Sequence, residues 1–216
     1  KRAGISLQMA DGCSLDNLSV SNIIMDKVDC AIWIQQWDPP DQGKTKPGTL
    51  SNIILSNIQA TNTDSIGCII TGLPDYPIKN ITLSNIRVSY KGGGAKDLVT
   101  KEMGELPELG NKSYYHQRIN NHDQYGMLPA YGLYCRHVDD LVMENIELSY
   151  ESSDYRPALY FKDGRYSRLS GLKAYHEEDA ESLIVIDGSK NIDINDCSAT
   201  KNIGSLARIK KGSKHI

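Results

Sequence analysis

The heptapeptide Asn80-Ile81-Thr82-Leu83-Ser84-Asn85-Ile86 recurs along the chain in nearly constant register. In it, apolar residues stand two apart, a polar pair ending in asparagine follows, and a second apolar alternation begins. This pattern is typical of two short strands joined by a tight bend. Three further clear or partial copies begin at Asn17, Asn52 and Asp140, and a degenerate copy begins at Asn191.

The asparagine at the bend has a physical reason. Asparagine tolerates left-handed backbone geometry, and its side chain can hydrogen-bond neighbouring main chain. If the copies stack, their asparagines should form a ladder along one edge of the molecule. We therefore expect Asn22, Asn57, Asn85 and Asn145 to lie one above another.

A third short strand accompanies each pair, as in Ala31–Gln35 and Gly132–Arg136. Three short strands per turn and a unit of roughly 24 to 35 residues indicate an all-β, single-stranded, right-handed parallel β-helix. We expect residues 1–216 to form one such domain. The competing solenoid is the leucine-rich repeat, which Leu50–Ile58 fits in part. Ile58 stands where that consensus has Asn or Cys, and no helical segment follows it.

Composition narrows the possible functions. The 216 residues are 39% hydrophobic and 24% charged, a globular balance, and the net charge of −3 gives no bulk attraction to nucleic acid. No stretch approaches the eighteen or so apolar residues of a membrane span. The five cysteines lack paired metal-site spacing, so we expect mostly buried thiols, no metal and no cofactor. Because the chain begins on Lys1 and is already in a strand pattern there, we expect it to be a processed chain or a fragment of a longer one.

One long loop, residues 91–127, interrupts the repeat with turn formers and charges. Such an excursion is usually functional or mobile. A flap that covers the flank of the solenoid and a substrate lid both remain open. Its His116, His122 and Asp123 lack the spacing of metal ligands on a helix or strand, and we expect them to be solvated.

Alternation along the third strand directs a set of polar and aromatic side chains away from the core. Stacked about 4.8 Å apart, they would line one face together with Ser6 and Gln8. Aromatic rings offer flat apolar surfaces to sugars, and cations pair with uronate carboxylates. The alternative is an edge whose polar groups are solvated and whose aromatic rings pack under loops. The candidate substrate-binding residues are Trp33, Gln35, Tyr134, Arg136, His137, Tyr160 and Lys162.

Several stretches together carry a family resemblance. The most specific is Leu128–His137, with the sequence LPAYGLYCRH, and it is joined by Arg2–Gly12, Pro77–Ile86 and Tyr90–Gly94. The chain resembles the C-terminal half of bacterial glycoside hydrolase family 28 proteins, the polygalacturonase and rhamnogalacturonan hydrolase relatives of the pectin-lyase-like type. That resemblance implies a right-handed parallel β-helix, an acidic plant-type polysaccharide as ligand, and a secreted or periplasmic bacterial protein.

The family's catalytic motifs are missing from their usual place. It is an inverting family, and inversion requires two carboxyl groups roughly 6.5 to 9.5 Å apart. Asn62-Thr63-Asp64 and Asp139-Asp140 copy the letters of two catalytic motifs but lie downstream of the Arg2 block, whereas the family's motifs lie upstream. We expect them to be turn residues, and the catalytic residues of this chain are unknown.

Two classes of function follow. In the first, the chain is part of a pectin-directed glycoside hydrolase and supplies solenoid scaffold and distal sugar subsites. In the second, it is a noncatalytic β-helix that grips polysaccharide, as tailspikes and adhesins do.

Overall fold

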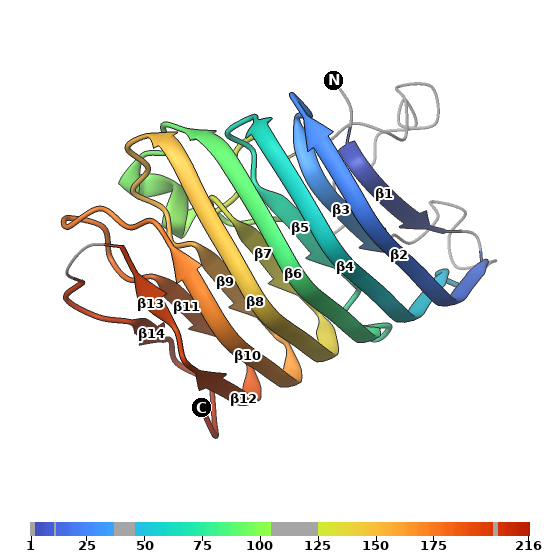
Figure 1. The fold of residues 1–216 in the computed structure, drawn as a ribbon. Coiled ribbons are helices and arrows are strands. Elements are labelled where there is room, and N and C mark those ends of the chain that lie inside the picture. The colour runs from blue at the N-terminus through green and yellow to red at the C-terminus, as the bar shows by residue number, and fades with distance from the viewer. Residues whose placement is uncertain (1–2, 11, 37–45, 105–124, 201–202) are drawn as a thin grey trace.

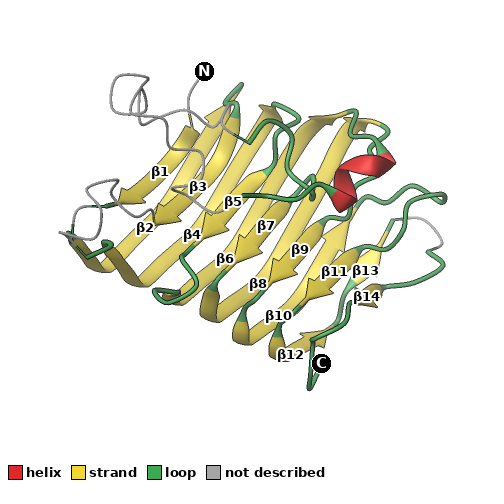
Figure 2. Ribbon diagram, turned by 180° about the vertical axis from the view of Figure 1, so that it is seen from behind, coloured by secondary structure: helices red, strands yellow, loops and turns green. Residues whose placement is uncertain are grey.

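The computed structural model describes residues 3–10, 12–36, 46–104, 125–200 and 203–216, which form two sheets of parallel strands (Figures 1 and 2). The short-strand sheet contains, in spatial order, β1 (Ala3–Met9), β3 (Cys30–Gln36), β5 (Cys68–Thr71), β7 (Leu133–Arg136), β9 (Leu159–Lys162), β11 (Ile184–Asp187) and β14 (Ala207–Ile209). The long-strand sheet contains β2 (Ser14–Asp26), β4 (Thr49–Thr63), β6 (Ile78–Gly92), β8 (Val138–Ser152), β10 (Arg165–Ala174) and β12 (Lys190–Asn195), and β13 (Ser198–Ala199) pairs with β10.

Every strand pairs with the equivalent strand of the next coil, so the predicted parallel β-helix is confirmed. Ile53 pairs with Ile81, which pairs with Leu141, and all three side chains are buried. The same inward stacking continues through the other apolar positions of the repeat. One continuous core therefore fills the space between the two sheets.

The predicted asparagine ladder is present. Asn57 Nδ2 donates to Asn22 Oδ1 at 3.1 Å, Asn85 Nδ2 to Asn57 Oδ1 at 3.0 Å, and Asn145 Nδ2 to Asn85 Oδ1 at 2.7 Å. All four have left-handed backbones, with φ between 53° and 60°. A second row of left-handed residues runs through Asn17, Asn52, Asn80 and Asp140.

The number of strands per coil differs from the expectation of three. At each asparagine bend the backbone turns without losing its pairing to neighbouring coils, so the two predicted short strands form one long bent strand. The fifteen residues of β4 include left-handed Asn52, Asn57 and Asn62. The coil is thus built from one long and one short strand.

The long loop begins later than predicted, because β6 continues to Gly92. A short 3₁₀ helix, η1 (Lys96–Thr100), follows it, and residues 105–124 lie outside the described residues, as do His116, His122 and Asp123. The described flanks of the loop pack on the outer face of the short-strand sheet, where Val99, Met103 and Tyr125 are buried (Figure 2).

A buried ion pair attaches this loop to the coil beneath it. Arg156 and Asp154 are fully buried, and Arg156 Nη2 lies 2.7 Å from Asp154 Oδ2. The guanidinium also donates to the carbonyls of Ser65 and Leu128 at 2.7 and 3.1 Å, while Asp154 accepts the amide of Gly94 at 2.9 Å. One pair of charges therefore fixes both ends of the loop.

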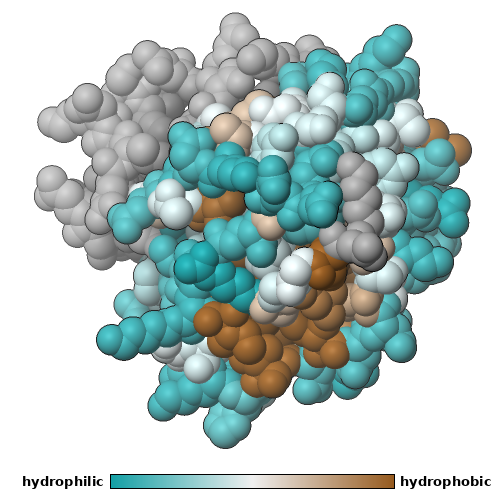
Figure 3. Space-filling model, turned by 90° about the vertical axis from the view of Figure 1, so that its left-hand side faces the viewer, coloured by the Kyte–Doolittle hydropathy of each residue, from teal (hydrophilic) through white to brown (hydrophobic). Residues whose placement is uncertain are grey.

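The first and last coils of the described chain are less buried than the coils between them, as expected of a stack in which each unit contacts its neighbours. Leu15 and Leu18 at one end, and Ile194 and Leu206 at the other, pack against the core while staying half-buried. Figure 3 shows the resulting apolar patch at the C-terminal end, where Ile209 is also exposed. Among the described residues, no helix is long and apolar enough to cross a membrane.

Candidate functional site

All the predicted binding residues except His137 stand in two adjacent rows on the outer face of the short-strand sheet. Trp33 is in the row that continues through Tyr134 to Tyr160. Gln35 is in the row that continues through Arg136 to Lys162. Alternation along the strand therefore predicted the direction of these side chains correctly.

These rows do not form an open surface. Trp33, Tyr134 and Arg136 are each only 2% exposed, and Trp33 and Tyr134 belong to one buried cluster with Val99, Met103 and Tyr125 of the loop's described flanks. Trp33 stacks on Tyr125 of that loop with 5.9 Å between ring centroids, and its indole N–H donates to Gln35 Oε1 at 2.8 Å. This arrangement corresponds to the alternative weighed above, in which aromatic rings pack under a loop.

Arg136 holds a flank of the long loop over these rows through hydrogen bonds. Its guanidinium donates to the carbonyl of Met103 at 2.7 Å and to that of Gly104 at 3.3 Å, and its Nε donates to Thr71 Oγ1 at 3.2 Å. An arginine that is bonded to backbone carbonyls can reach a uronate only if the loop moves away. The contact of Arg136 with a sugar, predicted from the sequence, remains a prediction.

The remaining members of the rows are also engaged. Tyr160 donates its hydroxyl to Asp187 Oδ2 at 2.8 Å and accepts from Lys210 Nζ at 2.6 Å, and Tyr134 packs against it at 5.4 Å between centroids. Burial and the neighbouring carboxylate of Asp187 raise the pKa of Tyr160. Lys162 is half-buried beside this group.

His137, the seventh candidate, has a different environment. It follows β7 at the turn between the two sheets, in a left-handed conformation with φ of 50°, and its counterpart one coil on, Asp163, has φ of 51°. Left-handed non-glycine residues recur at the bends of every coil in this chain, so this conformation marks a bend of the solenoid. Both residues line a groove of about 590 Å³ together with Pro74, Asp75, Pro77, Lys79, Asp139 and Arg165.

The floor of this groove carries alternating charges. Lys79, Asp139 and Arg165 are register partners on the adjacent strands β6, β8 and β10, so the carboxylate stands between two cations. Burial raises the pKa of Asp139 above its usual 3.8, and Asp140 adds to the rise, although Arg165 and Lys79 oppose it. Desolvation outweighs the attraction of the flanking cations.

The chemistry of the groove suits a hydroxyl-rich ligand whose carboxylate, if it has one, lies beside the two cations, because the groove also holds three aspartates. Two exposed cations can pair with carboxylates, and three aspartates can accept hydrogen bonds from hydroxyl groups. Within the described part of the chain, no three His, Cys, Asp or Glu residues gather as metal ligands.

Sequence reasoning singled out only His137 among the groove residues as a binding residue and took Asp139 for a turn residue. Asp139 instead lies in β8 and faces the groove, while Asp140 occupies the bend and is exposed. The signal that could have found the others is their repeat position, because Asp163 and Arg165 stand where His137 and Asp139 stand one coil earlier.

Comparison with known proteins adds little to this picture. No family model and no curated protein matches the chain. One match among solved structures is a Parabacteroides merdae protein named "putative glycosyl hydrolase", with 11% identity over 91% of this chain and 78% of that chain and a TM-score of 0.45. A similarity of this size carries no functional conclusion for this chain.

Proposed function

We propose that this chain is part of a glycoside hydrolase directed at pectin-type polysaccharide, and that it supplies the β-helical scaffold and a distal subsite for an acidic sugar. The groove beside His137 is that subsite. Such a protein would work outside the cytoplasm, in the periplasm or after secretion, where plant-type polysaccharide is met.

One observation carries the proposal: the row in which Lys79 and Arg165 flank Asp139 at the floor of an open groove. A uronate carboxylate can pair with an exposed arginine or lysine through charge-assisted hydrogen bonds, and aspartates can bind the ring hydroxyls. His137 and Asp163 add polar groups held on a constrained turn. The resemblance of Leu128–His137 to the polygalacturonase relatives supports the same class of ligand.

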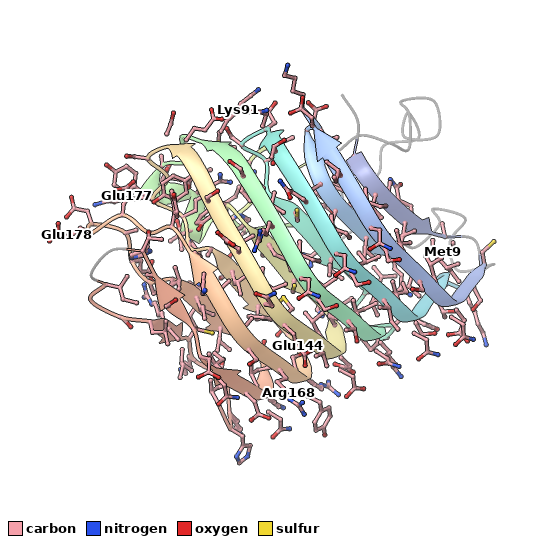
Figure 4. All side chains as sticks on the ribbon, viewed as in Figure 1. Met9, Lys91, Glu144, Arg168, Glu177 and Glu178 are labelled. Atoms are coloured by element: carbon pink, nitrogen blue, oxygen red, sulfur yellow. The ribbon has the colours of Figure 1, made fainter. Side chains whose placement is uncertain are left out.

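The test is titration calorimetry with tetragalacturonate and with neutral galactotetraose. Arg165→Ala should weaken tetragalacturonate binding by about tenfold or more, because a charge-assisted hydrogen bond contributes about 1.5–3 kcal/mol. The matched control is Arg168→Ala, which removes an exposed arginine from the same strand but outside the groove (Figure 4). Equal losses in the two variants would reject the subsite.

The second candidate function is noncatalytic gripping of polysaccharide, which the open groove and its charged floor could serve without any catalytic step. Both candidates require the groove to bind a sugar. Cleavage of polygalacturonan by the parent protein, but not by this chain alone, would favour the hydrolase.

A further inference from the structure

A second pocket lies at the other end of the long strands from the groove. It has a volume of about 440 Å³ and is lined by residues at the end of β8 or just beyond the ends of β8 and β10, among them Tyr150, Glu151, Ser153, Tyr175, His176 and Glu177. Figure 4 shows Glu177 beyond the end of β10, far from Arg168 near its start. We call it the tyrosine pocket.

Tyr175 gives this pocket an exposed aromatic wall. It is the last ring of a row of edge-to-face tyrosines, Tyr90, Tyr131, Tyr150 and Tyr175, with centroid distances of 5.9, 5.1 and 5.5 Å. The first three rings are buried, whereas Tyr175 is 42% exposed. The row holds the ring in place, and so Tyr175 presents a fixed apolar surface to a ligand.

His176 gives the pocket an unsatisfied polar group. The side chain is 2% exposed, and its Nδ1 has no hydrogen-bond partner among the described residues. A buried polar atom without a partner costs free energy, and such an atom in a native structure calls for an explanation. His176 lines the tyrosine pocket, so a ligand bound there could supply the missing partner.

The charges of the pocket select the kind of ligand. Glu151 and Glu177 contribute carboxylates, and no Lys or Arg is among the described residues that line the pocket. Tyr150 donates its hydroxyl to Glu177 Oε1 at 3.1 Å, which holds one of these carboxylates at the wall. Carboxylates accept hydrogen bonds from hydroxyl groups and repel anions.

From these contacts we infer that the tyrosine pocket binds a neutral sugar unit, which packs on Tyr175 and hydrogen-bonds to His176 Nδ1. The ligand class follows from the polysaccharide proposed above, but the site is separate from the groove. Acidic units of a mixed polysaccharide would then bind at Arg165, and neutral units would bind at Tyr175.

The test uses galactotetraose as the neutral probe and tetragalacturonate as the acidic one. Galactotetraose should shift the imidazole NMR resonances of His176, which are assigned by their loss in His176→Asn, and tetragalacturonate should not. Tyr175→Ala should weaken galactotetraose binding by about tenfold. Tyr166→Ala is the matched control, since Tyr166 is exposed on β10, the strand that Tyr175 follows, but does not line the pocket.

These experiments distinguish a failure of the tyrosine-pocket proposal from a failure of the groove proposal. Tyr175→Ala should keep full affinity for tetragalacturonate, and Arg165→Ala should keep full affinity for galactotetraose. If galactotetraose leaves the His176 resonances unmoved, or if Tyr166→Ala loses as much affinity as Tyr175→Ala, the tyrosine pocket is not a sugar site. The groove proposal would be unaffected by that result.

Discussion

Asn57 combines a left-handed backbone with two hydrogen bonds of the asparagine ladder. Replacing it with alanine keeps the unfavourable backbone and removes both bonds, so Asn57→Ala should cost about 2 kcal/mol of unfolding free energy. Asn57→Gly removes the same bonds but fits the backbone, and it should cost clearly less. Urea denaturation of both variants measures the difference. Equal costs would mean that the left-handed geometry is not what selects asparagine here.

Asp139 makes stability depend on pH. Folding raises the pKa of Asp139, so its protonated form favours the folded chain. This stabilisation is complete below the pKa that Asp139 has in the unfolded chain, and it is lost as pH rises through the pKa that it has in the folded chain. Asp139→Asn should therefore be more stable than wild type near about pH 7, by less than about 1 kcal/mol at this half-buried site, and equal to it near about pH 3. Thermal unfolding at both pH values checks this. A variant less stable than wild type at neutral pH would show that ionised Asp139 is stabilised by its cations.

At the scale of single residues, the sequence predicted those features that depend on a residue's own chemistry and on its neighbours in the chain. Asparagine at the bends follows from its backbone tolerance, and the outward direction of Arg136 follows from alternation. The burial of Arg136 could not be predicted, because it depends on the carbonyls of Met103 and Gly104, which arrive from a loop of irregular sequence. Periodicity carries no information about where such a loop packs.

At the scale of elements, the buried pair of Asp154 and Arg156 attaches both ends of the long loop to the coil beneath it. Arg156→Met leaves a buried carboxylate without its cation and should destabilise the chain by about 3–5 kcal/mol. The double variant Asp154→Asn/Arg156→Met removes both charges and should recover part of that loss. Urea unfolding of the two single variants and the double variant measures the coupling. A double variant that loses the sum of the single losses would show that the pair does not act as a unit.

The repeat pattern predicted some features of these elements correctly and others wrongly. It predicted parallel coils and the inward stack of Ile53, Ile81 and Leu141, because the period of two residues fixes which side chains face the core. It predicted three strands per coil, whereas the structure has two. The bend at Asn57 turns the chain without breaking its pairing to the next coil, so two predicted strands form one. Hydrophobic alternation alone does not distinguish a bend within a strand from a break between two strands.

For the whole molecule, we predict binding without cleavage. The two stretches that copy catalytic motifs lie downstream of the Arg2 block, not upstream as in the family 28 proteins that the chain resembles, so purified residues 1–216 should release no reducing sugar from polygalacturonan. Release that disappears in Asp139→Asn would contradict this and would make Asp139 a catalytic acid, a role for which a raised pKa is suited. Asp140→Asn, on the neighbouring exposed bend residue, is the control.

The central claim is that an acidic sugar binds in the groove and not on the covered rows around Trp33. A crystal structure of the chain with tetragalacturonate tests it most directly. We predict a uronate carboxylate beside Arg165 and Lys79, ring hydroxyl groups toward Asp139, and the loop still seated over Trp33. A sugar stacked on Trp33 with the loop displaced, or a groove without sugar at a saturating concentration of the ligand, would contradict the account.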